Sequence, residues 1–394
     1  MSLKRLVSDT IEKQAETFKA ISRSIGRNPE LGHREYEAAR LLTAELEKQG
    51  FSVERGTLGL ETAFIGSYSA VKPGPTAAFL CEYDALPELG HACGHHLICS
   101  MSLAAAVGLK AAVDELGGTI RVYGTPAEET AGAKVTMAAA GLFDDCDFAL
   151  MAHPYYSFEK SGESLAMDAV RYEFAGKAAH AAASPHEGVN ALDAVIQLFN
   201  AVNALRQQVR SDARIHGIID NGGKAPNIIP DYASAKFYIR SASRSYTNEL
   251  AAKVRRCAEG AALQTGAALT VTNYELSYDE LLTNETLSER FTANLLEGGV
   301  RPEEIETGKD HGSLDLGNVS LRCPAIHPYV KIVEQRYSLH TPEFRDAAMT
   351  EQALDRMIFA ARMLAATAYD VFADPKLLAA IRAEFEASVR RRLS

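Results

Sequence analysis

One short run of the sequence gathers most of the side-chain types that bind metal ions. Between Cys81 and Leu97 the sequence reads CEYDALPELGHACGHHL, with three histidines, two cysteines and three carboxylates. Cys93 and His95 stand two residues apart, so in an extended turn both side chains can face one ion. We therefore expect a metal site here. The alternative is a surface histidine cluster beside a buried cysteine, which a single Cys-x-His pair does not exclude.

The segments on either side of this run predict regular structure. The apolar segment Thr76–Cys81 predicts a buried strand, and the Ala- and Leu-rich residues 97–115 predict a helix. Open α/β sheets place their active sites outside the carboxyl ends of their strands. The run rich in metal ligands therefore lies where an active site is expected.

Two further predicted strand ends carry candidate ligands or acid–base groups. The predicted strand 118–124 leads into Glu128 and Glu129, and the predicted strand 148–152 is followed by His153. A glutamate pair alone is more often a solvated loop, and a lone histidine is more often structural. Because three successive strand ends offer such groups, we favour one shared site over coincidence.

Size and composition limit the class of protein. A chain of 394 residues is long for one hydrophobic core and predicts two domains. The net charge of −10 argues against a nucleic-acid partner, which requires clustered Lys and Arg. No apolar run approaches the roughly 18–20 residues of a membrane span, and the N-terminus lacks the apolar core of a secretion signal. Since the six cysteines show no disulfide spacing, we expect a cytoplasmic protein without a membrane partner.

The pattern of the sequence changes near residue 166. From there to about residue 281 it predicts strand, helix, two strands, helix and strand, the order of a ferredoxin-like domain. We therefore expect an α/β fold in which residues 1–166 and 282–394 form one domain with a central mixed sheet flanked by helices. Residues 167–281 would form an inserted α+β domain.

Several motifs in a fixed order support a family resemblance. The chain resembles the di-metal amidohydrolase and exopeptidase superfamily of aminoacylases, glutamate carboxypeptidase and indole-acetyl-amino-acid hydrolases. The HACGH motif is similar to that of the branch with aminobenzoyl-glutamate hydrolase-like and β-alanyl-dipeptidase-like proteins. The resemblance covers nearly the whole chain and rests on NPELGHREYEAA, YDALP, GHACGH, the Glu128-Glu129 pair, His153, GKAAHAAASPHEGVNAL, NIIPD with the following Arg240, and SLHTPEF.

The resemblance implies a role for each matching residue. It implies two divalent metal ions per subunit, a catalytic domain that binds them, and an inserted domain that dimerises and acts as a lid. His180 would reach into the partner subunit's site and hydrogen-bond the developing oxyanion, with His186 as its competitor for that role. The implied metal ligands are Cys93, His95, Glu129, His153 and His340; Glu128 would be the general base, Asp84 would orient a ligand, and Asn227 and Arg240 would hold the substrate's carboxylate or nearby backbone.

Two positions depart from the pattern of many relatives. Glu82 stands where many carry a histidine, although an acid is usual in the branch with a cysteine in the metal loop. His96 follows the CGH motif where relatives often have Asn or Asp, so it could be a polar neighbour or an alternative ligand. We interpret His91 as a support for the loop.

The implied chemistry is the hydrolysis of an amide bond. Two metal ions can hold a hydroxide between them and lower the pKa of water from 15.7 toward about 7, while Glu128 carries the proton to the leaving amine. A thiolate from Cys93 favours zinc, and the His and Glu ligands also suit manganese. Arg240 offers a bidentate fork for a carboxylate.

These observations favour a metal-dependent amidohydrolase or exopeptidase. We expect it to act as a homo-oligomer on N-acyl amino acids or dipeptides with a free carboxylate, such as p-aminobenzoyl-glutamate or β-alanyl dipeptides. One alternative is a broad-specificity metallo-dipeptidase or carboxypeptidase. The other is a non-catalytic ligand-binding homologue, against which the retention of Glu128 speaks, because a binding protein has no need of a base.

Overall fold

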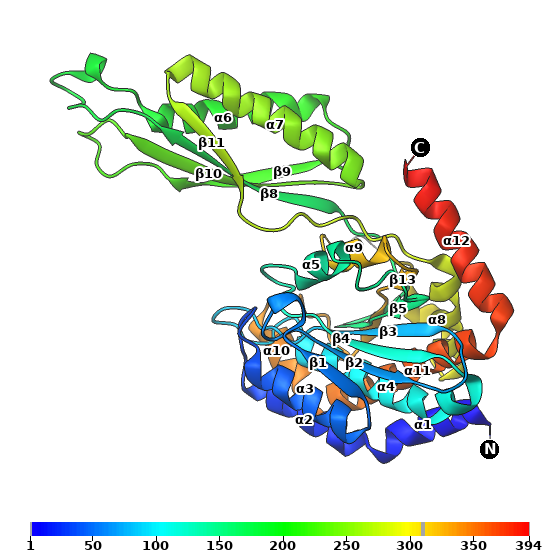
Figure 1. Ribbon diagram of the computed structural model, residues 1–394. Coiled ribbons are helices and arrows are strands. Elements are labelled where there is room, and N and C mark those ends of the chain that lie inside the picture. Colours follow the sequence, from blue (N-terminus) through cyan, green and yellow to red (C-terminus); the bar gives the residue numbers. More distant parts are fainter. Residues whose placement is uncertain (1, 309–311, 394) are drawn as a thin grey trace. The chain divides into compact units, whose positions relative to one another are not determined.

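The computed structural model describes residues 2–308 and 312–393 (Figure 1). The chain divides into two compact units. Unit 1 comprises Met1–Glu163, Leu281–His311 and Asp315–Ser394, and unit 2 comprises Ser164–Glu280 and Gly312–Leu314. Together they form a mixed α/β fold in which unit 2 is inserted into the sequence of unit 1. The predicted fold class is thus confirmed.

A six-stranded mixed sheet forms the centre of unit 1. Its strand order is β1-β2-β4-β3-β5-β13, and β3 pairs in parallel with both β4 and β5. β3 is almost wholly apolar and buried, as is typical of a strand covered on both faces. The strands are β1 Ser52–Arg55, β2 Phe64–Ser69, β3 Thr76–Cys81, β4 Thr119–Gly124, β5 Phe148–Leu150 and β13 Ala325–Ile326.

Helix α4, His95–Leu116, is the central helix of this unit. It packs against β3 and β4, and helices α1, α2 and α11 pack against it on the same side of the sheet (Figure 1). At Gly108, a Cβ atom would lie 2.5 Å from Ile11 of α1, so glycine allows the close approach of the two helices. By length and composition alone α4 could cross a membrane, contrary to the expectation that no run is apolar enough, yet 89% of its apolar window is buried inside the protein.

The remaining elements of unit 1 surround these two layers. A second, four-stranded sheet has the order β12-β7-β14-β6. Its strands are β6 His153–Tyr155, β7 Phe158–Glu159, β12 Ile305–Glu306 and β14 Tyr329–Lys331. The other helices are α1 Leu3–Lys13, α2 Ala15–Arg27, α3 Tyr36–Lys48, α5 Ala133–Ala139, α8 Glu285–Glu297, α9 Leu316–Ser320, α10 Pro342–Ala348, α11 Glu351–Ala373 and α12 Pro375–Leu393.

Unit 2 has the predicted β-α-β-β-α-β order. Its antiparallel sheet has the strand order β11-β8-β10-β9, and α6 and α7 lie together on one face of it (Figure 1). Alternation along β10 buries Phe237 and Ile239 beneath the helices and leaves Lys236 and Tyr238 partly exposed. The elements are β8 Ala166–Ala175, α6 Ala191–Leu205, β9 Arg214–Asn221, β10 Tyr232–Ser241, α7 Arg244–Thr265 and β11 Ala268–Asn273.

Candidate metal centre and active site

Three neighbouring parallel strands bring the candidate residues to one edge of the main sheet. β3 lies between β4 and β5, so the segments that follow the three strands start side by side. The backbone N–H of Thr125, just after β4, donates to the carbonyl oxygen of Cys81 at the end of β3 (2.9 Å). The predicted third strand ends earlier than expected, at Leu150, and His153 begins the next strand, β6.

A left-handed glycine positions the two ligands of the metal loop. Gly94, between Cys93 and His95, has φ +83° and precedes the first residue of α4. A Cβ atom there would lie 2.6 Å from the ring of Pro154, so a larger residue would be both strained and crowded. The loop is therefore sharply turned at this point and not extended, as the spacing alone had led us to expect.

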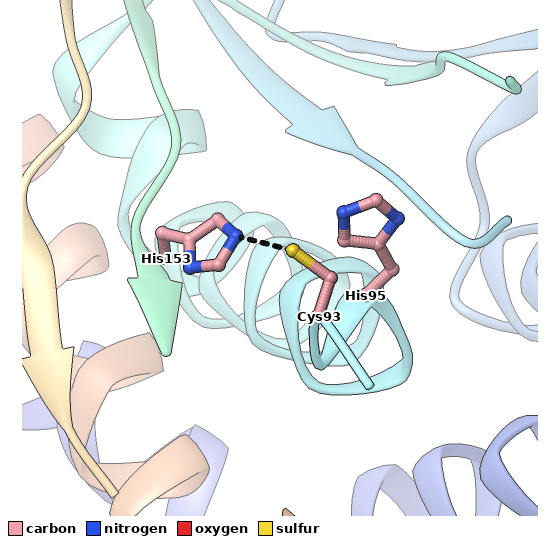
Figure 2. A group of neighbouring side chains, drawn as sticks. All are labelled: Cys93, His95 and His153. Atoms are coloured by element: carbon pink, nitrogen blue, oxygen red, sulfur yellow. Dashed lines mark hydrogen bonds between the residues drawn. The ribbon is translucent and has the colours of Figure 1, made fainter. Parts of the chain in front are cut away.

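Cys93, His95 and His153 form a buried group of potential ligands (Figure 2). One ligand atom from each lies within 4.8 Å of the others, and Sγ of Cys93 is 3.4 Å from Nε2 of His153. Nδ1 of His153 lies 2.8 Å from the carbonyl oxygen of Pro154. If Nδ1 donates to that carbonyl, Nε2 is left with a free lone pair directed at the group.

Asp84 connects two of the expected ligands. Nδ1 of His95 lies 2.9 Å from Oδ1 of Asp84, and the backbone N–H of Glu129 donates to Oδ2 at 3.0 Å. A carboxylate on one imidazole nitrogen leaves the other nitrogen to bind a metal ion. Nε2 is therefore the nitrogen of His95 that can act as a ligand.

Glu129 and His340 complete the group on its more open side. Nε2 of His340 lies 3.1 Å from Oε1 of Glu129, and Cys93, Glu129 and His340 form a second group within 4.8 Å. The His340 side chain is 49% exposed, whereas that of Glu129 is 10% exposed. His340 has φ +61°, a strained conformation for a residue other than glycine, and its N–H donates to the carbonyl of Ala92.

Glu128 lies beside these groups and follows a strained residue. Ala127 has φ +60°, and its backbone N–H donates to Oε1 of the buried Glu35 at 2.9 Å. Glu128 belongs to one group of potential ligands with His95 and Glu129, and to another with Glu82 and Asp315. Burial first, and then the charges of Glu82 and Glu129, raise the pKa of Glu128 well above its ordinary value.

The donor set fits divalent cations. Burial raises the pKa of the Cys93 thiol, and burial followed by the neighbouring His327 lowers the pKa of His153 to about 3, which keeps its ring neutral. A bound cation reverses this preference at a thiol and holds it as the thiolate. One thiol, three imidazoles and two carboxylates within reach of one another form a set suited to zinc or manganese.

His91 and His96 lie outside the ligand groups found among the described residues. Both are buried, with their rings 5.2 Å apart. Nε2 of His96 lies 3.3 Å from the carbonyl oxygen of Ala348, and burial lowers its pKa to about 4. His96 thus faces α10 and its neighbours, and the geometry gives no support to its being an alternative ligand.

The sequence patterns gave no role to three further residues beside the site. Lys134 of α5, Asp315 before α9, and Glu82 after β3 are fully or almost fully buried. Nζ of Lys134 lies 2.7 Å from Glu82 and 2.6 Å from Asp315. The available signal was a lysine within the otherwise mainly apolar segment AKVTMAA, which by itself looks like a surface residue.

Unit 2 carries the other three residues that the resemblance selected. His180 and Asn227 are exposed and lie side by side, because His180 pairs with Ile228 in a β-bridge and the N–H of Ala181 donates to the carbonyl of Asn227. The Arg240 guanidinium stands over the Tyr238 ring, 5.1 Å from its centroid. His186 is exposed in the short helical turn Pro185–Glu187.

Comparisons with known proteins agree with this geometry. Residues 167–265 match the family model described as a peptidase dimerisation domain. The chain is 38% identical over 403 residues to the Xaa-Arg dipeptidase of Mus musculus, covering 98% of this chain and 93% of that protein. The chain belongs to the M20 peptidase family. Across 95% of this M20 peptidase, it is also 30% identical to one of the p-aminobenzoyl-glutamate hydrolase polypeptides of Escherichia coli K12, of which 93% is covered.

Solved structures show the same fold. A dinuclear metal-binding peptidase of Bacillus subtilis from the M20 family superposes with a TM-score of 0.64, covering 90% of this chain and 98% of that one, at 19% identity. The predicted recognition is confirmed, and this M20 peptidase is a hydrolase of amide bonds. A non-catalytic binding protein is thereby disfavoured.

Proposed function

We propose that this M20 peptidase hydrolyses dipeptides and N-acyl amino acids that carry a free carboxylate. The observation that carries the proposal is the convergence of Cys93, His95, Glu129 and His340 beside Glu128. The catalytic domain would comprise residues 1–166 and 282–394, and residues 167–281 would form the dimerisation and lid domain.

The two metal ions would be held by Cys93, His95, Glu129, His153 and His340. When bound, zinc or manganese polarises the scissile carbonyl and lowers the pKa of a water molecule near it. Asp84 holds His95 so that Nε2 faces the site. The imidazole of His95 is therefore oriented for a metal ion by a contact within the protein.

Glu128 would act as general base and then as general acid. A glutamate beside the attacking water can accept its proton and pass it to the leaving nitrogen. The strained turn at Ala127, fixed by Glu35, directs the backbone immediately before Glu128. We therefore assign the proton transfers to Glu128 and metal binding to Glu129.

His180 would donate a hydrogen bond to the developing oxyanion in the partner subunit's site. Its Nδ1 accepts hydrogen bonds from the backbone N–H groups of Ala182 (3.2 Å) and Ala183 (3.1 Å). In the neutral ring the proton therefore resides on Nε2, which makes Nε2 the donor that an oxyanion requires. His186 makes no comparable pair of hydrogen bonds among the interactions described.

Asn227 and Arg240 would bind the free carboxylate of the substrate. A guanidinium provides parallel N–H groups for a carboxylate. The Tyr238 ring beneath Arg240 restrains the guanidinium by a cation–π contact. This proposal places a bidentate cation and an amide on the same unit as His180.

The enzyme would be a cytoplasmic homodimer. Unit 2 contains the dimerisation-domain match, and its edge strand β9 exposes almost all of its side chains. Ile218 and Ile219 on that strand are 63% and 46% exposed, which is unusual for two adjacent isoleucines on a sheet edge. Pairing of β9 with its copy would cover both.

A dipeptide is the first substrate class to test. Two of the curated relatives are Xaa-Arg dipeptidases, from Mus musculus and Homo sapiens, at 38% and 36% identity over 98% of this chain. The p-aminobenzoyl-glutamate hydrolase polypeptide is 30% identical. Cleavage of N-acyl amino acids such as p-aminobenzoyl-glutamate is the second candidate.

A panel of dipeptides and N-acyl amino acids, assayed with zinc and with manganese, tests the proposal. We expect about 10²–10⁴-fold loss of kcat in Glu128→Gln, because general acid–base catalysis contributes about that factor, with unchanged metal content by elemental analysis. The exposed Glu54→Gln serves as the matched control. Retained turnover in Glu128→Gln, or no turnover of any amide in the wild type, contradicts the assignment.

A further inference from the structure

The carboxylate nearest to the metal-facing nitrogen of His95 belongs to Glu82. Oε2 of Glu82 lies 3.4 Å from Nε2 of His95, whereas Oε1 of Glu129 lies 3.9 Å away. Nδ1 of His95 is already occupied by Asp84. Glu82 therefore approaches the one nitrogen of His95 that remains for a metal ion.

A buried lysine fixes the other oxygen of Glu82. Nζ of Lys134 lies 2.7 Å from Oε1 of Glu82, and the side chains of Lys134 and Glu82 are 0% and 3% exposed. Although burial alone lowers the pKa of a lysine, Asp315 and Glu82 raise the pKa of Lys134, so its ammonium is charged. The ion pair holds Oε1 and leaves Oε2 directed at His95.

Asp315 is not available in the same way. Its Oδ1 lies 2.6 Å from Nζ of Lys134, and its Oδ2 accepts a hydrogen bond from the backbone N–H of Lys134 at 3.2 Å. Both oxygens of Asp315 are thus bound to one residue. Glu82 is the carboxylate of this cluster that keeps an oxygen toward the metal centre.

Burial of three charged side chains is costly unless their arrangement is required. Removing an ammonium and a carboxylate from water costs several kcal/mol per ion, and a buried pair often stabilises a fold no better than apolar residues of the same size. An extra lysine–carboxylate cluster beside the site is therefore poorly explained by stability alone. Control of the direction of a carboxylate at a metal centre accounts for it.

We propose that Glu82 is a sixth protein ligand of the metal centre, and that Lys134 and Asp315 are positioning residues that direct its Oε2 there. This inference rests on the proposed metal centre. Lys134 neutralises one of the two buried carboxylates it holds, so the centre gains an anionic ligand without an unpaired charge behind it. His95 and Glu82 would share one cation.

Cobalt titration of the metal-free wild type and of Glu82→Gln tests the proposal. The charge-transfer band of a cobalt thiolate reports binding at Cys93, and the intensity of the d–d bands reports the number of ligands. We expect at least a tenfold loss of cobalt affinity in Glu82→Gln, with altered d–d bands and a retained thiolate band. Affinity within twofold of wild type with unchanged bands overturns the proposal.

Two further variants separate positioning from folding. Lys134→Met with Asp315→Asn removes one cation and one anion together, and circular dichroism reports whether it folds. We expect a folded protein with intact Glu82 to lose cobalt affinity and change its d–d bands, because Oε1 has lost its anchor. Glu82→Asp keeps the charge but withdraws the oxygen, and we expect weaker binding, so it serves as the test if Glu82→Gln is unfolded.

The same titration distinguishes the two proposals. Wild-type protein that binds about two cobalt ions while Glu82→Gln matches it leaves the proposed metal centre standing and removes Glu82 from it. Wild-type protein that binds no cobalt removes both. Unchanged affinity in folded Glu82→Asp and in the Lys134→Met/Asp315→Asn protein likewise overturns the roles of Glu82 and Lys134.

Discussion

Nδ1 of His95 lies 2.9 Å from Oδ1 of Asp84, and both side chains are buried. The second oxygen of Asp84 accepts the backbone N–H of Glu129, so one carboxylate orients two proposed ligands from different strand ends. Burial lowers the pKa of His95, but Asp84 and Cys93 raise it by more. The arrangement holds the imidazole in one orientation, with Nε2 toward the site.

Asp84→Asn should therefore weaken metal binding without unfolding the protein. Loss of a carboxylate that orients a ligating histidine typically costs about 10–100-fold in metal affinity. The amide of asparagine also has to face either His95 or the N–H of Glu129 with a donor. Calorimetric titration of the metal-free protein with zinc measures the change.

Asp114→Asn is the control for that experiment. Asp114 accepts a hydrogen bond from Tyr68 at the surface, away from the metal loop. We expect its zinc affinity to equal that of the wild type. Equal affinity in Asp84→Asn would show that Asp84 does not govern His95.

The buried Glu35 should make stability depend on pH. Burial raises its pKa from 4.5 to about 7, although it accepts hydrogen bonds from Thr62 and Ala127. Between pH 4.5 and 7 the folded carboxyl keeps its proton while the unfolded one ionises, so this group lowers stability as pH rises. The full effect is about 3 kcal/mol and is complete above about pH 7.

Glu35→Gln should remove that part of the pH dependence. We expect the fall in melting temperature from pH 5 to pH 8, measured on metal-free protein, to be a few degrees larger in wild type than in Glu35→Gln. Wild-type behaviour is expected of the exposed Glu54→Gln. Identical pH profiles for wild type and Glu35→Gln would refute the assignment.

The exposed edge of unit 2 should control the oligomeric state. Lysine at Ile218 and Ile219 would place two charges on the edge strand β9, and charged edge residues oppose strand pairing. We expect light scattering to give the mass of one chain, 42.6 kDa, for the double variant and twice that for the wild type. Val71→Lys, at a fully exposed position in unit 1, should stay dimeric. A double variant that remains dimeric would place the interface elsewhere.

Hybrid dimers test whether sites are shared between subunits. A His180→Ala chain keeps Glu128, and a Glu128→Gln chain keeps His180, so a mixed dimer has one complete site if each site borrows its partner's His180. Random exchange should restore about one quarter of wild-type activity from two nearly inactive proteins. Mixed-isotope mass spectrometry verifies the exchange, and absence of rescue despite exchange would argue against a shared site.

Much of the fold follows from local patterns. The apolar segment Thr76–Cys81 was predicted with the bounds that the structure has, and the order of elements in unit 2 also matches. Such segments are predictable because burial on both faces selects an unbroken apolar run, and alternation selects a half-buried strand. The third strand was predicted too long because the apolar residues 151–152 continue past the point where the chain changes sheets at His153.

The sequence by itself determined which residue types the site can use: Cys93, His95, Glu128, Glu129 and His153 all follow predicted strands. Only the tertiary structure decided their directions, through a left-handed Gly94 and the two hydrogen bonds to Asp84. It alone joined Lys134 to Asp315, which is 181 residues away along the chain. Local patterns report periodicity and spacing, whereas the pairing of buried charges depends on which distant segments the packed core brings into contact.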